Sequence, residues 1–385
     1  VVTLVSASFF VGCDRQEMAP KENQTSTFKA KGPEVVILTW EEYFSPEVID
    51  LFTKETGSTI KFEYYKNLDE MQGMIQSHPG YYDLVVTDGG SLADLIDLQL
   101  LRPIDKGEIS NLKNLDPKYL GVKFDPSNTF SIPYMWGTTL LAYRSDLIPE
   151  PKQSWTALWD PRFKGKVLML DDSFDSYAVS LLSLGHGINS ESPKELEEAT
   201  EHLVDQVHKV NSEFVDIIEA RKRLLSGDCW IAMTYSSDAA VLAEENENIA
   251  YFIPEEGAAM WVDSFAVPKE APNPEGAHQF LDFICRADVA GMNSNFLWCA
   301  SANREARKFL SEEVLAEETL YPGEETLKKC ELDSQSGVGR NRLVNRGMKL
   351  VYDSIQTNRE KEGEAQRTAD AGNRDRAGES NQTEE

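Results

Sequence analysis

The hydrophobic pattern of the chain alternates between short apolar runs and segments that carry one apolar stripe. Residues 34–39 form a run of apolar, mostly β-branched residues, which predicts a buried strand. Ser45 and Pro46 then predict the start of a helix, as N-cap and first helical residue, and Gly57 predicts its end. The alternation continues, with strands predicted at 59–64 and 82–86 and helices at 67–76 and 92–97. This β-α-β-α-β-α order indicates a parallel, doubly wound sheet.

A second unit of the same kind begins after a predicted strand at 139–143. Further strands are predicted at 166–170, 230–234, 249–253 and 261–267. Further helices are predicted at 176–184, 193–208, 215–226 and 273–285. We therefore expect two α/β units without an internal repeat, and ligands of such sheets bind at the carboxyl ends of the strands.

The two ends of the chain depart from this pattern. Residues 1–13 are mostly apolar and end at Cys13; they look like the h-region of a signal peptide and resemble a relaxed bacterial lipobox. We expect a lipid on Cys13 that anchors the protein to a membrane, with a buried N-terminal strand as the alternative. Residues 14–33 are polar and predict a flexible tether. Residues 359–385 contain no apolar residue larger than Ala, which predicts a disordered acidic tail.

Length and charge narrow the classes of function. The 385 residues suffice for about two domains. The formal net charge of −27 argues against binding to a nucleic acid, because phosphate contacts depend on Lys and Arg, and it favours a cationic ligand. After Cys13, no apolar run approaches the roughly 20 residues that a membrane-spanning helix needs.

Metal and catalytic motifs do not emerge from the sequence. Four cysteines follow Cys13, namely Cys229, Cys285, Cys299 and Cys330. Their spacing matches no zinc motif, so buried free thiols are expected, although pairing is open to an exported protein. The sequence has no GxSxG, and the SxxK at 110–113 lacks its companion motifs. Carboxylate pairs leave a glycosidase as an alternative, but we expect no metal, no cofactor and no catalysis.

Acidic and aromatic residues gather where the predicted strands end. They are Trp40, Glu41, Glu42, Tyr43, Asp88, Asp171, Asp172, Asp175, Tyr235 and Asp238, together with Trp261 and Asp263 on one face of a strand. In an α/β protein these positions share one crevice, and no Lys or Arg is among them. Carboxylates attract ammonium groups, and aromatic faces attract them too while covering methylenes. The set suits a linear diamine or polyamine, whereas a sugar needs more neutral donors and a metal needs oxygens or imidazoles without rings.

Four segments carry a resemblance to a known family. They are PYMWGTT (133–139), SWTALWDPRFKGKVLMLDD (154–172), PEEG (254–257) and WVDSFAVPKEAPNPEGAHQFLDF (261–283). The chain, over roughly residues 34–356, resembles the periplasmic spermidine/putrescine-binding proteins of ABC importers. The resemblance implies a two-lobed α/β fold of the periplasmic-binding-protein type (type II-like), with a sheet flanked by helices in each lobe and the ligand in the cleft. It places 34–138 and 263–303 in lobe 1, and 139–262 and 304–358 in lobe 2.

The resemblance also implies the ligand-binding residues. The positions that match the family's polyamine contacts are Trp40, Glu42, Tyr43, Asp172, Asp175, Tyr235, Asp238, Trp261, Asp263 and Gln335. Two positions depart from the family pattern. Asp88 and Gly90 stand where the family has Ser and an aromatic residue, so we expect Asp88 to bind an amine while one stacking ring is lost. Cys299 stands where the family has Tyr, with Trp298 beside it as the substitute ring.

These observations predict a binding protein rather than an enzyme. We expect a periplasmic, lipid-anchored monomer that binds putrescine or spermidine and delivers it to an ABC permease in the inner membrane. Asp238 favours putrescine and Trp261 favours spermidine, so the preference between the two is open. The alternative is a binder or sensor of another cationic or zwitterionic small molecule with no part in import.

Overall fold

The computed structural model describes residues 33–333 and 338–380. Cys13, the tether as far as residue 32, Gln335 and residues 381–385 lie outside the described residues, so the predictions made for them stay predictions. The strands are β1 Glu34–Thr39, β2 Thr59–Tyr64, β3 Leu84–Thr87, β4 Ser131–Arg144, β5 Val167–Leu170, β6 Glu213–Val215, β7 Ile231–Tyr235, β8 Ile249–Phe252, β9 Ala259–Ala266, β10 Ala300–Ser301 and β11 Glu331–Leu332.

The helices agree with those predicted up to residue 285, except that α7 was not predicted. They are α1 Pro46–Thr56, α2 Leu68–Ser77, α3 Gly89–Asp97, α4 Ser173–Ser183, α5 Pro193–Val210, α6 Ile217–Ser226, α7 Ser236–Glu245, α8 Pro274–Ile284, α9 Ala287–Leu297, α10 Glu312–Ala316, α11 Glu324–Leu327 and α12 Val338–Ser380. Short 3₁₀ turns fill the connections at 106–108, 110–114, 117–119, 155–159, 161–163 and 304–309. Helix α1 begins after Ser45 and ends at Gly57 in the left-handed conformation, as predicted, although the Ser45 side chain makes no capping hydrogen bond.

The strands form one mixed sheet in the order β2-β1-β3-β9-β4-β7-β5-β6, with β10 and β8 paired to β4 and β11 to β9. Strands β1, β2 and β3 are parallel, as are β5, β6 and β7, which confirms the predicted βαβ units. Strand β9 is antiparallel to both β3 and β4, so the whole sheet is mixed, a feature that the strand–helix order did not predict. The reason is that β4 leaves the first unit and β9 returns to it, and a buried apolar run does not reveal its direction.

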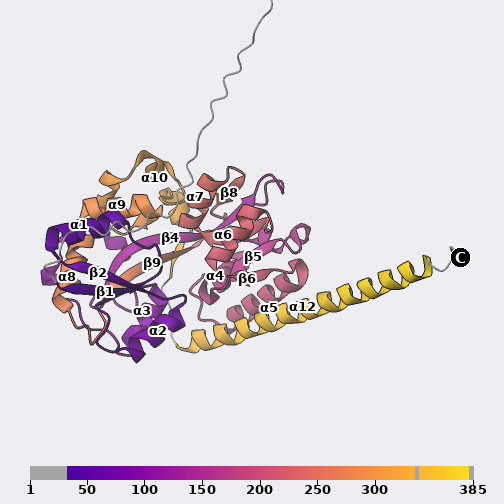
Figure 1. The fold of residues 1–385 in the computed structure, drawn as a ribbon, viewed down its shortest axis with the longest axis horizontal. Coiled ribbons are helices and arrows are strands. Elements are labelled where there is room, and N and C mark those ends of the chain that lie inside the picture. The colour runs from indigo at the N-terminus through magenta and orange to yellow at the C-terminus, as the bar shows by residue number, and fades with distance from the viewer. Residues whose placement is uncertain (1–32, 334–337, 381–385) are drawn as a thin grey trace, which may run out of the picture.

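The two largest clusters of buried apolar residues lie toward the two ends of this sheet. One gathers around β1 and β3 under α1 and α8, and the other gathers around β5 and β7 under α4 and α5. Strand β4 serves both, because residues 131–138 pair with β9 and residues 139–143 pair with β7. Figure 1 shows α1, α8 and α9 around the first core, α4, α5 and α6 around the second, and β4 and β9 running between them. The chain is therefore built as two α/β units that share their central strands.

The C-terminal helix α12 packs along α5 and then extends beyond the body of the protein (Figure 1). Val344, Met348, Val351 and Ile355 bury its first part in the second core. The helix continues to Ser380. The disordered acidic tail expected at 359–385 stays a prediction. A segment rich in Glu, Ala and Arg has high helix propensity and can continue an existing helix.

Two further predictions concern thiols and membrane spans. Cys229, Cys285, Cys299 and Cys330 are buried and unpaired, which confirms the expectation of free thiols. Burial raises the pKa of Cys229 and of Cys285 to about 12, so both are protonated at neutral pH.

Within residues 33–333 and 338–380, no helix combines the length and the apolar character that crossing a bilayer requires.

Candidate functional site

Strand β9 carries the first part of the site. Because side chains alternate along a strand, Trp261 and Asp263 project from the same face of β9. The Tyr43 hydroxyl, which lies just beyond the end of β1, donates a 2.5 Å hydrogen bond to Asp263 Oδ2. Tyr43 is fixed in turn, because the Tyr134 hydroxyl donates to its carbonyl oxygen over 3.0 Å and the two rings meet edge to face. The carboxylate at β9 is thus oriented by the loop that follows β1.

Asp263 is buried, with 8% of its surface exposed. Burial raises the pKa of Asp263 to about 7, since an ion removed from water loses hydration, and the charge of Asp88 raises it further. The hydrogen bond from Tyr43 acts in the opposite direction. The same burial raises the pKa of Tyr43 well above its usual value, so Tyr43 stays a neutral donor.

Helix α4 carries the second part of the site. Asp172 follows β5 as the N-cap of α4 and accepts from the backbone N–H of Asp175 over 2.9 Å. Asp175 lies within the first turn, where its carboxylate accepts from Thr139 Oγ1 over 2.6 Å and from the Tyr235 hydroxyl over 3.1 Å. Burial and mutual repulsion raise the pKa of Asp172 to about 7. Burial raises the pKa of Asp175 to about 6, with the charges of Asp333 and Asp88 adding to the rise.

Tyr235 and Trp261 join the two parts. Their ring centroids lie 5.8 Å apart with the planes at 79°, an edge-to-face contact between the end of β7 and β9. The Trp261 ring lies directly over Gly137 of β4, where an added Cβ would overlap the ring and would lie 2.9 Å from Ser236 Oγ. The indole Nε1 of Trp261 is buried and has no hydrogen-bond partner among the described residues.

Asp88 connects the acids of both units. As N-cap of α3 it accepts from the backbone N–H groups of Gly90 and Ser91 through Oδ1, over 2.7 and 3.0 Å. Its second oxygen, Oδ2, is buried without a partner among the described residues. The charge of Asp88 raises the pKa of each of Asp172, Asp175 and Asp263, which places it within electrostatic range of all three. The structure therefore brings Asp88 to the predicted acids.

One acid of this group was missed at the level of sequence. Asp333 follows β11, is 9% exposed, and acts electrostatically on Asp175. Strand β11 has only two residues, so no hydrophobic run announces it and Asp333 has no visible place after a strand. The other acids were identified because each directly follows or lies on a predicted strand. Asp333 could have been found in this way only if the pairing of β11 with β9 had been known.

Asp238 and the Trp298–Cys299 pair lie on the flank of this group. Asp238 forms an ion pair with Arg221, with 3.7 Å between Nη1 and Oδ1, so a basic residue outside the predicted set lies beside this acid. Burial nevertheless raises the pKa of Asp238 to about 6. Cys299 is buried and within electrostatic range of both Asp263 and Asp238. Trp298 packs against the apolar cluster of Leu310, Val314 and Leu320.

Glu42 and Trp40 lie toward the outer edge of the sheet. Glu42 is exposed, in the left-handed conformation at φ 56°, and lines a small pocket together with Trp40 and Tyr43. Phe62 and Tyr64 of β2 form the outer wall of that pocket. The rings of Trp40 and Tyr43 meet edge to face, with 5.4 Å between their centroids. Trp40 therefore contacts the residue whose hydroxyl binds Asp263.

The charge balance of the central acids indicates what they bind. Among the described residues, no Lys, Arg or His forms an ion pair with Asp88, Asp172, Asp175 or Asp263. Buried carboxylates without counter-charge are costly to ionise, so a ligand that carries several positive charges would gain from all of them. Carboxylates near the rings of Tyr43, Tyr235 and Trp261 are chemically suited to an organic cation.

Comparison with known proteins relates the chain to a described family. Residues 47–314 match the family model described as bacterial extracellular solute-binding protein. The chain is 34% identical over 303 residues to the spermidine/putrescine-binding periplasmic protein of Escherichia coli K12, which covers 77% of this chain and 86% of that one. It is 30% identical over 315 residues to the putrescine-binding periplasmic protein SpuD of Pseudomonas aeruginosa UCBPP-PA14, covering 76% and 84%.

Solved structures show the same fold. A putative spermidine/putrescine ABC transporter protein from Listeria monocytogenes superimposes with a TM-score of 0.75 at 28% sequence identity, covering 83% of this chain and 98% of that one. The predicted fold class, an α/β periplasmic-binding-protein fold with two lobes, is thereby confirmed.

Proposed function

Because the chain belongs to the family of bacterial extracellular solute-binding proteins, we propose that it binds a polyamine, putrescine or spermidine, outside the cytoplasm and delivers it to an ABC importer. The family consists of solute-binding components of transporters and is not a family of enzymes. Curated relatives at 30–34% identity carry spermidine and putrescine in their names. The predicted function rests on this relationship together with the chemistry of the site.

One observation carries the choice of ligand. Asp263 comes from the first unit and Asp175 from the second, both are buried, and neither is ion-paired among the described residues. Two carboxylates on opposite sides of a row of rings match an aliphatic chain that ends in ammonium groups. We propose Trp40, Glu42, Tyr43, Asp88, Asp172, Asp175, Tyr235, Asp238, Trp261, Asp263, Trp298 and Gln335 as the ligand-binding set, and we add Asp333 to it.

We propose that the protein has two lobes that close on the ligand. We propose lobe 1 as 34–138 with 263–303, and lobe 2 as 139–262 with 304–358. The distribution of the cores supports this division, since the first core draws its residues from 35–135 and 265–299 and the second from 141–259 and 344–355. A ligand held by acids of both lobes favours the closed arrangement, because only that arrangement lets it contact both.

Binding is tested by isothermal titration calorimetry and thermal shift with putrescine, cadaverine, spermidine and spermine, with neutral amino acids and sugars as controls. We expect saturable binding of at least one polyamine and a melting temperature that rises with its concentration. A melting temperature unchanged by every polyamine but raised by another cation or zwitterion would favour the alternative binder or sensor. Uptake of labelled polyamine by cells with and without the protein tests delivery to an importer.

The anchoring of the protein is a separate proposal. We propose that Cys13 carries a lipid that holds the protein at the membrane as a monomer in the periplasm. Labelling of cells with a fatty acid, followed by purification of the protein and of its Cys13→Ser variant, tests it. Label in the first and none in the second is the expected result, and equal labelling of the two would reject the lipid site.

A further inference from the structure

Residues 171–175 join β5 to α4 and carry two acids of the proposed site, Asp172 and Asp175. We refer to them as the acidic turn. Its first residue, Asp171, makes a different contact from its neighbour, because its carboxylate accepts a 2.5 Å hydrogen bond from the hydroxyl of Tyr352 on α12. Burial raises the pKa of Tyr352 and the hydrogen bond with Asp171 adds to the rise, so the phenol stays a neutral donor. Helix α12 is therefore bonded to the residue directly before Asp172.

A second contact from α12 reaches the acidic turn on the other side of Asp172. The guanidinium of Arg340 lies 5.5 Å from the centroid of the Phe174 ring, and Phe174 directly precedes Asp175. Arg340 is buried, and its Nε and Nη2 donate to two carbonyl oxygens of the segment 188–190, over 3.2 and 3.0 Å. These bonds fix the guanidinium in place. Helix α12 thus contacts the acidic turn both before and after Asp172.

The acidic turn needs such support because its own carboxylates repel each other. Burial raises the pKa of Asp172, and the charge of Asp175 raises it further. Once both acids are ionised, like charges in a buried site tend to move apart. Contacts from outside the turn offset this repulsion, and Asp171 and Phe174 are the points at which α12 supplies them.

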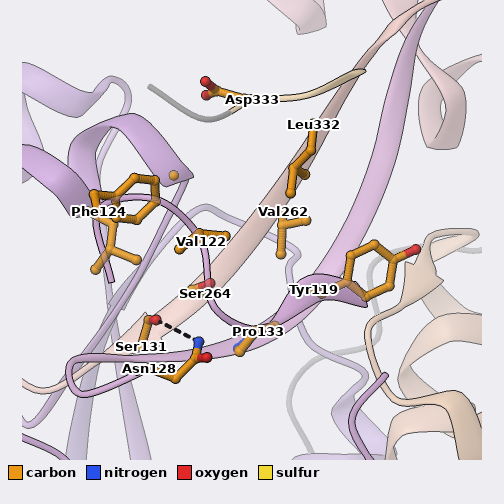
Figure 2. A pocket seen from close by; sticks show the side chains of 12 residues that line it. Tyr119, Val122, Phe124, Asn128, Ser131, Pro133, Val262, Ser264, Leu332 and Asp333 are labelled. Atoms are coloured by element: carbon orange, nitrogen blue, oxygen red, sulfur yellow. Dashed lines mark hydrogen bonds between the residues drawn. The ribbon is translucent and has the colours of Figure 1, made fainter. Parts of the chain in front are cut away.

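Helix α12 is also connected with β9, the strand that carries Asp263. Strand β11 precedes α12 in the chain and pairs with β9, and just after it the backbone N–H of Asp333 donates to the carbonyl oxygen of Met260 over 2.9 Å. Figure 2 shows Leu332 of β11 beside Val262 of β9, and the two side chains belong to one apolar cluster. Further along, α12 packs against α5 and α4. It is therefore placed to set the position of the acidic turn.

We propose that Tyr352 and Arg340 are positioning residues for polyamine binding, which hold the acidic turn in the arrangement that receives the ligand. The proposal rests on the proposed function and gives a part in it to α12, which supplies no residue of the proposed ligand-binding set. A ligand with ammonium groups gains most from carboxylates that are already in place, because it does not have to order them on binding. Loss of either contact should lower affinity without removing a contact to the ligand.

Tyr352→Phe tests the first contact, because it removes the hydroxyl and keeps the ring that packs edge to face against Phe214. Tyr251→Phe is the matched control. The Tyr251 hydroxyl also donates to a carboxylate, that of Glu317 over 2.6 Å, but it joins β8 to the end of α10 instead. Calorimetry with spermidine and putrescine measures affinity, and thermal melting measures stability. We expect Tyr352→Phe to weaken binding about three- to tenfold and Tyr251→Phe to bind like the unaltered protein.

Double variants separate positioning from a general loss of stability. In an Asp172→Asn background the effect of Tyr352→Phe on affinity should largely disappear, because the charge that the contact positions is absent. In an Asp263→Asn background the effect should persist, because Asp263 lies on β9 and not in the acidic turn. Arg340→Lys tests the second contact, since a lysine keeps the charge but not the planar fork that donates to both carbonyl oxygens. It should weaken binding with the same dependence on Asp172.

The contrary outcomes are distinct. Unchanged affinity in Tyr352→Phe, an equal loss in Tyr251→Phe, or equal effects in the two acid backgrounds overturns the positioning role of Tyr352 and leaves the proposed function standing. Arg340 is removed from the role if Arg340→Lys binds like the unaltered protein or if its effect is the same in both backgrounds. Failure of the unaltered protein to bind either amine rejects the proposed function, and the positioning role with it.

Discussion

The Tyr43 hydroxyl and the Asp263 carboxylate, 220 positions apart in the sequence, meet in a 2.5 Å hydrogen bond. Tyr43 stands at the exit of β1, and Asp263 stands on the strand that returns from the second unit. The bond fixes one oxygen of a buried carboxylate that has no cation among the described residues. It thereby fixes the carboxylate of Asp263, which we propose as one end of the binding site.

A buried acid of the proposed site should contribute more to polyamine affinity than an exposed one. We expect Asp263→Asn to weaken polyamine binding by about 1–3 kcal/mol, since it removes a charge-assisted hydrogen bond in a site without water screening. Glu42→Gln should have a smaller effect, because Glu42 is exposed and its charge is screened. Calorimetry on both variants measures the difference. An Asp263→Asn protein with full affinity would remove Asp263 from the site.

The close contact between Gly137 and Trp261 allows the proposed role of the Trp261 ring to be tested without substituting Trp261 itself. Gly137→Ala places a methyl group inside the Trp261 ring, so the indole must move away from Tyr235. We expect affinity to fall by about tenfold or more as the aromatic wall is displaced. Gly323→Ala, where a Cβ meets nothing within 4 Å, is the control and should bind normally. Unchanged affinity in Gly137→Ala would place Trp261 outside the contact with ligand.

The raised pKa values of the central acids predict a dependence on pH with a definite sign. The pKa is about 7 for Asp172 and Asp263 and about 6 for Asp175, against an ordinary value of 3.8. Between about pH 4 and pH 7 the folded protein therefore binds more protons than the unfolded chain. The free energy of unfolding of the ligand-free protein falls as the pH rises through this range.

Ligand binding should show the opposite trend. Ammonium groups favour the ionised carboxylates, so affinity should rise from about pH 5 to about pH 7.5 with release of protons. Melting curves with and without spermidine across this range measure both trends at once. A ligand-induced shift in melting temperature that is the same at both ends of the range would contradict the assignment of these acids to the site.

Two glycines of α12 should respond in opposite ways to the same substitution. A Cβ at Gly347 would overlap the Tyr177 hydroxyl and lie 2.5 Å from Thr200 Oγ1, where α12 crosses α4 and α5. We expect Gly347→Ala to lower the free energy of unfolding by about 2 kcal/mol or more. At Gly339 a Cβ meets nothing within 4 Å, so Gly339→Ala should be neutral or stabilising by about 0.5–1 kcal/mol. Chemical denaturation of both variants measures this, and equal stabilities would mean that α12 is not tightly docked.

The sequence alone determined most of the local structure. Ser45, Pro46 and Gly57 mark the ends of α1, and the apolar runs at 34–39 and 166–170 predict β1 and β5, because capping and hydrophobic periodicity are local properties. The same rule identified Asp88, Asp172 and Asp175 as acids at strand ends. Side-chain type and position along the chain suffice for such predictions.

Only the tertiary structure decided how these pieces meet. The antiparallel direction of β9, the pairing of Asp238 with Arg221 and the arrival of Asp333 beside Asp175 depend on contacts between segments far apart in the sequence. Composition could not show that α12 continues through residues 359–380, because a helix can extend from a docked first part. Local rules fix which residues stand at the end of each strand, whereas charge pairing and burial are set by neighbours that a linear sequence does not specify.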